Sequence, residues 1–152
     1  MKKVLLVALT AVVFMACSKE EVKDEIVSRI EATAVMTADI DSVSVSFPGT
    51  TFSFVSATNT LSIAGAALNG HAISISCFVE SEGELAQKTD EEAVYSHAIN
   101  TNDFDSSAKQ GSLTITKWDT DNDLISGTFN FKYLRDQDTV YVTNGVFTDL
   151  GK

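Results

Sequence analysis

Three aspartates at alternate positions, Asp119, Asp121 and Asp123, have the spacing at which carboxylates converge on a calcium ion. A calcium-binding loop also needs glycine at its sixth position and glutamate at its twelfth, where this chain has Leu124 and Asn130. The segments on both sides alternate like strands, which favours an acidic hairpin turn. The aspartates are therefore a weak metal candidate, and we expect neither a metal nor a cofactor.

Other catalytic and metal-binding patterns are weaker still. His71 and His97 are the only histidines, and zinc sites need three or four converging ligands. Cys77 shares an alternating face with Ile73 and Ile75, which predicts a buried, inert thiol. The chain contains no phosphate-binding loop and no serine-hydrolase elbow. We expect no catalytic residue, although a carboxylate pair for hydrolysis need not be close in sequence and stays an alternative.

The aromatic side chains allow two interpretations. They form either a platform for a sugar or small ligand, or the packing of the core and of cross-strand pairs, which we favour. Simple alternation places Trp118 on the face opposite Leu113 and Ile115, beside the acidic turn. The residues concerned are Tyr95, Trp118, Tyr133 and Tyr141.

The N-terminus has the pattern of a secretory signal peptide. Lys2 and Lys3 precede an apolar run from 4 to 14, which is too short for a spanning helix of about 20 residues. The four residues from Phe14 to Cys17 then resemble the lipobox of bacterial lipoproteins. That resemblance implies a diacylglyceryl group on the Cys17 thiol and cleavage after residue 16. The second acyl chain matters, because one chain alone holds a protein only marginally at a membrane.

The residues after Cys17 indicate where the anchored protein goes. Lys19, Glu20 and Glu21 resemble the surface-export signal of Bacteroidetes lipoproteins, although the same residues also fit the start of a solvated linker. The resemblance implies a palmitate-bearing protein of the bacterial outer membrane that faces the cell surface. The periplasmic face is the alternative location.

The charge of the chain excludes one class of partner. The sequence has 11 basic and 21 acidic residues, and removal of residues 1–16 leaves 9 against 21, a formal charge of −12. Such a surface repels nucleic acid and anionic lipid. With Cys17 lipidated, Cys77 is the single remaining thiol, so no intramolecular disulfide is expected.

We expect residues 17–31 to be a tether with a possible short helix, and residues 32–152 to be a single antiparallel β domain. Short runs of period two predict an all-β fold, either an antiparallel β-sandwich or a flattened meander barrel of about 8–10 strands. Asn144 and Gly145 predict a bulge within the last strand, since only seven residues follow them. Two long polar segments, 80–92 and 100–110, are the expected places for recognition.

Several segments together resemble a family. They are residues 61–65, the strand around Tyr95, and residues 111–116, 125–131 and 142–147, whose order is similar to that in Bacteroidetes lipoproteins of unknown function, the DUF6252-like proteins. Gly83-Glu84-Leu85 departs from the glycine-x-aromatic pattern of that family. The resemblance implies architecture and location, and no catalytic residue.

The expected function is therefore that of a membrane-anchored envelope lipoprotein carrying a non-catalytic binding or accessory module. We expect its ligand to be a small molecule, a glycan or a protein. A passive structural envelope protein is the alternative, and a carboxylate-dependent hydrolase comes third.

Overall fold

Alternating apolar and polar residues place most of the described chain in β-strands. The computed structural model describes residues 35–99, 107–108, 110–135 and 137–152. Cys17 and the Lys19–Glu21 signal lie outside these residues, as does the tether. Within the described residues there are eleven strands and one short 3-10 helix, η1. The strands are β1 (Met36–Ile40), β2 (Val43–Ser46), β3 (Gly49–Val55), β4 (Thr60–Ala66), β5 (His71–Phe78), β6 (Gln87–Thr89), β7 (Ala93–Ile99), β8 (Ser107–Ala108), β9 (Gln110–Asp119), β10 (Leu124–Arg135) and β11 (Asp138–Gly151), and η1 spans Asp90–Glu92.

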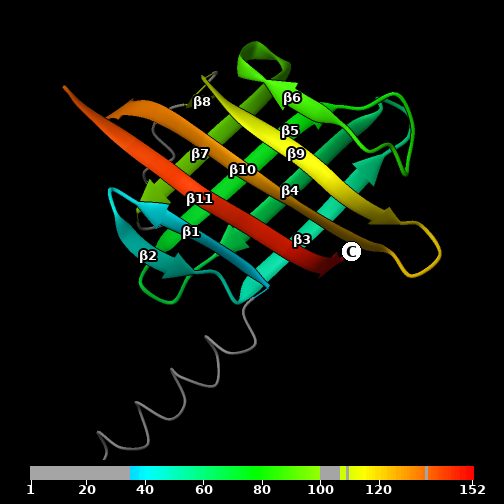
Figure 1. Cartoon of the computed structure of the whole chain (residues 1–152), viewed down its shortest axis with the longest axis horizontal. Coiled ribbons are helices and arrows are strands. Elements are labelled where there is room, and N and C mark those ends of the chain that lie inside the picture. Colours follow the sequence, from blue (N-terminus) through cyan, green and yellow to red (C-terminus); the bar gives the residue numbers. More distant parts are fainter. Residues whose placement is uncertain (1–34, 100–106, 109, 136) are drawn as a thin grey trace, which may run out of the picture.

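The strands form two open antiparallel sheets. The first has the order β2-β1-β11-β10-β9-β6, and the second has the order β3-β4-β5-β7-β8. Figure 1 shows the first sheet in front, with its strands running across those of the second sheet behind it. The predicted all-β antiparallel sandwich is confirmed, and the alternative of a closed barrel is wrong. The expected count of 8–10 strands is slightly low, because β6 and β8 have only 3 and 2 residues and carry no alternating pattern.

The core fills the space between the two sheets. Along β10 every second side chain is buried, including Ile125, Phe129 and Tyr133, while the residues between them face solvent. The ring of Phe131 stacks on that of Tyr95 from the opposite sheet, with centroids 5.2 Å apart. This apolar layer is the main force that joins the sheets, because burial of aromatic and aliphatic area dominates folding energetics.

Cys77 belongs to this core. Its side chain is 5% exposed, and burial raises the pKa of its thiol to about 11. The thiol is free, and the prediction that it is a buried small hydrophobe is confirmed. A protonated, buried thiol is a poor nucleophile.

The prediction that Trp118 lies on the face opposite Leu113 and Ile115 is wrong, because β9 contains a β-bulge. The β9–β10 register pairs Lys117 with Ser126 but Ile115 with Gly127, so β9 contains one extra residue, Thr116. That residue reverses the alternation, and Trp118 faces the core with 8% exposure instead of lying opposite Leu113 and Ile115. Its indole ring packs edge-on against Phe52 and Phe54.

The second bulge lies where it was predicted. Strand β11 runs without a break through Asn144 and Gly145, and its pairing with β10 shifts by one residue between Phe129 and Phe131. Asn144 has a φ of 52°, in the left-handed region that asparagine tolerates better than most residues. Its side-chain amide donates a hydrogen bond to Asp39 of β1 at 2.8 Å.

Candidate functional site

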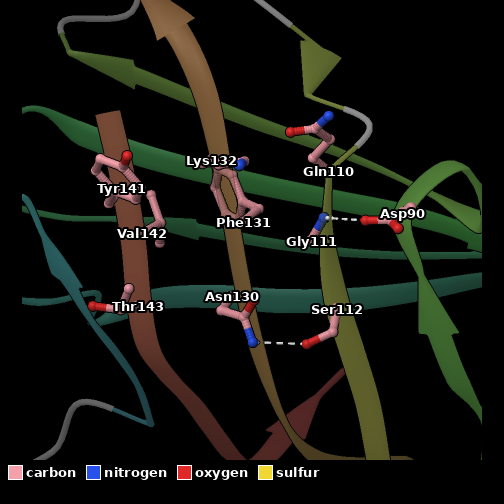
Figure 2. Close-up of a pocket in the computed structure, with 10 residues that line it drawn as sticks. All are labelled: Asp90, Gln110, Gly111, Ser112, Asn130, Phe131, Lys132, Tyr141, Val142 and Thr143. Carbon is pink, nitrogen blue, oxygen red and sulfur yellow. Dashed lines mark hydrogen bonds between the residues drawn. The ribbon is translucent and has the colours of Figure 1, made fainter. Parts of the chain in front are cut away.

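A groove of about 500 Å³ lies on the first sheet where β9, β10 and β11 run side by side (Figure 2). Alternation places most of its lining residues on the outer face of the sheet, away from the core. Tyr141 stands out among them, because 53% of its side chain is exposed. The lining consists of Asp90, Gln110, Gly111, Ser112, Asn130, Phe131, Lys132, Tyr141, Val142 and Thr143.

Strand register arranges the outward side chains in two rows across the three strands. The first row is Gln110, Lys132 and Tyr141, which are direct cross-strand partners. In the second row Ser112 pairs with Asn130, and the β11 bulge places Thr143 beside them. The Asn130 amide donates a hydrogen bond to the Ser112 hydroxyl at 2.7 Å, as Figure 2 shows. Side chains that are already held by a hydrogen bond lose less conformational entropy when a ligand binds.

The edge of the groove is built by β6 and η1. Strand β6 pairs with β9 and so brings Asp90, the next residue, beside Gly111. An Asp90 carboxylate oxygen accepts a hydrogen bond from the Gly111 amide at 3.4 Å. Gly111 must remain glycine, since a Cβ there would lie 2.4 Å from the carbonyl oxygen of Asn130 and 2.6 Å from the Cβ of Phe131.

The groove is polar and close to electrically neutral. Among its described lining residues the charged side chains are Lys132 and Asp90, one of each sign. It therefore offers one carboxylate, not the pair that glycoside hydrolysis uses. What it presents is an exposed aromatic ring surrounded by hydroxyl and amide groups, which suits non-covalent binding of a polar ligand.

Away from the groove, a partly buried chain of three polar side chains joins the two sheets. The Nδ1 of His71 lies 2.8 Å from the Nε2 of His97, and the Nδ1 of His97 lies 2.5 Å from the hydroxyl of Tyr133. The histidines are on neighbouring strands β5 and β7, whereas Tyr133 comes from β10 of the first sheet. His97 is 2% exposed, so its ring nitrogens are hydrogen-bonded to these two partners instead of to water.

Burial sets the protonation of this chain. Burial first, and then the nearby His71 and Arg135, lower the pKa of His97 to about 4, although Asp41 opposes the shift. Burial and Arg135 also lower the pKa of His71. At neutral pH both rings are thus uncharged, and in each of the two contacts one partner donates a hydrogen bond and the other accepts it. No group of three or more metal-ligating side chains includes these histidines within the described part of the chain.

The aspartates that resembled a calcium loop form a turn. The carboxylate of Asp119 accepts hydrogen bonds from the Asn122 amide nitrogen at 3.1 Å and from its side chain at 2.9 Å. These bonds hold the pKa of Asp119 below its usual value. Asp123 instead forms an ion pair with Lys152 at 2.5 Å. The predicted acidic hairpin turn between β9 and β10 is confirmed, and the carboxylates of Asp119 and Asp123 bind protein groups.

The structure separates the four aromatic residues that could have formed one platform. Tyr95 and Trp118 are in the core, and Tyr133 is buried against His97, so packing accounts for three of them. Tyr141 alone of the four is exposed, in the groove. Recognition was expected in the long polar segments, yet this groove lies mainly on strand faces, and only Asp90 and Gln110 of its lining come from those segments. The available signal was Tyr141 itself, an aromatic residue between the inward-facing Val140 and Val142.

These features define an antiparallel β-sandwich with a polar groove on the outer face of one sheet. The described residues include no helix long and apolar enough to cross a membrane. The chain belongs to the family of the domain of unknown function DUF6252, whose model matches residues 32–151. The resemblance seen in the sequence is confirmed for the family, while lipidation and bacterial group stay predictions. No curated protein and no solved structure matches the chain.

Proposed function

We propose that this protein is a lipid-anchored lipoprotein of a Bacteroidetes outer membrane whose β-sandwich is a non-catalytic binding module facing the cell surface. The attachment half of the proposal is supported by Cys17, by the apolar run before it and by Lys19, Glu20 and Glu21 after it. Two or more acyl chains on Cys17 anchor a protein stably, so the folded domain needs no membrane-binding surface of its own.

The observation that carries the binding half is the groove around Tyr141. A half-exposed aromatic ring beside amide and hydroxyl side chains is a surface that a ligand can cover, and it combines one aromatic face with several polar groups that can orient a ligand. A passive structural protein has no need of such a surface. A hydrolase needs a second polar group that acts on the substrate, and Asp90 has no carboxylate partner among the described lining residues.

Metabolic labelling with a palmitate analogue tests the anchor. The wild-type protein is expected to incorporate label and to fractionate with the outer membrane, and Cys17→Ser is expected to lose both properties. The control Cys77→Ser keeps the label, because that thiol is buried. Label retained by Cys17→Ser would refute the lipoprotein assignment.

Protease treatment of intact cells tests the orientation. Wild-type protein on the surface is expected to be digested, whereas alanine replacement of Lys19, Glu20 and Glu21 leaves the lipidated protein protected inside. Protection of the wild-type protein would place it on the periplasmic face. Equal digestion of both proteins would show that these three residues are only a linker.

A further inference from the structure

We propose that the groove binds a neutral oligosaccharide, with a sugar ring stacked on Tyr141 and its hydroxyl groups bound by the two rows of polar side chains. This inference rests on the proposed binding function and names its ligand class. The side chains that contact the sugar are Gln110, Ser112, Asn130, Lys132, Tyr141 and Thr143.

The size of the surface favours a small, extended ligand over a protein. The two rows span three strands, roughly 10 Å, and are separated by two residues along each strand, roughly 7 Å. A stable protein interface buries about 800 Å² on each partner, which is several times the area of these rows. The groove instead matches the 300–1,000 Å³ range of small-ligand sites, since its volume is about 500 Å³.

The chemistry of the rows matches a sugar. The ring of Tyr141 offers a flat apolar face, which suits the C–H face of a pyranose. Asn130 uses one amide hydrogen on Ser112, so its other amide hydrogen, its carbonyl oxygen and the Ser112 hydroxyl hydrogen are available to a ligand. Amide and hydroxyl groups both donate and accept, as a row of sugar hydroxyls requires.

Electrostatics favours a neutral ligand. Lys132 lies at the centre of the first row and Asp90 at the edge, so the groove has little net charge. The surrounding chain carries a formal charge of −12 without residues 1–16, and this field repels an acidic polysaccharide. Lys132 then acts as a hydrogen-bond donor to a sugar oxygen.

A printed array of neutral and acidic oligosaccharides tests the proposal with the detergent-solubilised full chain. The wild-type protein is expected to bind neutral members, and Tyr141→Ala to bind them about tenfold or more weakly. Tyr141→Phe, which keeps the ring, stays within about threefold of wild type. Phe78→Ala is the matched control, because Phe78 is an aromatic residue 58% exposed at the end of β5 in the other sheet.

The outcomes separate this proposal from the one on which it rests. An array without bound members, or binding equally strong in Tyr141→Ala, overturns the oligosaccharide inference. Preference for acidic members overturns the neutral class. If the array is blank but Tyr141 is needed to capture a protein or lipid from an envelope extract, the binding module stands and the sugar fails. If Tyr141→Ala changes neither assay, the groove is no binding site and both fail.

Discussion

Acid is expected to destabilise the sandwich through His97. The ring is 2% exposed and lies between His71 and the Tyr133 hydroxyl. If both histidines were protonated, an N–H group of each ring would face the other across the 2.8 Å contact. The other charged groups that act on His97 are Arg135, which also opposes its protonation, and Asp41, which favours it less strongly.

The magnitude follows from linkage. The pKa of His97 is about 4 in the folded chain, against its ordinary value of 6.5 in the unfolded chain. Between pH 6.5 and about 4 the histidine is protonated in the unfolded state but mostly neutral in the folded state, so the free energy of unfolding falls as the pH falls. Each pKa unit corresponds to about 1.4 kcal/mol, and lowering the pH from about 7 to about 4.5 is expected to remove about 2–3 kcal/mol of the free energy of unfolding. The lowered pKa of His71 acts in the same direction.

Urea unfolding of the wild-type protein and of His97→Gln at these two pH values measures this effect. Glutamine cannot titrate, yet its amide can still donate to and accept from both neighbours. The variant is expected to be less stable than wild type at pH 7 but to lose much less stability on acidification. The window ends at about pH 4.5 because carboxylates with lowered pKa, such as Asp39 and Asp149, begin to lose stabilisation below it. An equal loss in both proteins would refute the assignment to His97.

Two further predictions concern the core and the β11 bulge. In Cys17→Ser protein, Cys77 is expected to react with Ellman's reagent only after urea unfolding, since burial raises its pKa to about 11; full reaction in the native state would contradict its place in the core. Gly145→Ala is expected to lower the free energy of unfolding by about 1–3 kcal/mol, because the new Cβ would lie 2.5 Å from the Phe129 carbonyl oxygen. Gly151→Ala, with nothing within 4 Å, is the control and should match wild type in the same urea measurement.

Local alternation was enough to predict the longest strands and much of the core, although it placed Trp118 on the wrong face. The period of two in β10 identifies Ile125, Phe129, Phe131 and Tyr133 as inward residues without any knowledge of their partners. The same pattern predicts the burial of Cys77. Strands β6 and β8 were not predicted, because segments of 3 and 2 residues are too short to show an alternating pattern. Their pairing depends on neighbouring strands.

The histidine pair could not be predicted from spacing. His71 and His97 are 26 residues apart, and they meet because β5 and β7 are neighbours in the second sheet although β6 lies between them in sequence and joins the first sheet. Tyr133 reaches them only through the packing of one sheet on the other. Contacts of this kind depend on strand order and layer packing, which periodicity does not contain.

The position of the groove, in contrast, follows from the need to bury the apolar side chains of β9 and those of β10 on the same face of the sheet. In a regular hairpin closed by the pair Asp119–Leu124, Trp118 would face Ile125, as observed, but Leu113 would face the outward Asn130. The extra residue Thr116 resolves this conflict and pairs Leu113 with Phe129, so that both apolar sets face the core. The same shift turns Gly111 inward and sets Gln110 beside Lys132, and the regular β10–β11 hairpin then adds Tyr141. One inserted residue thus buries the apolar side chains and aligns the first row of the groove, which is why the site lies mainly on strand faces.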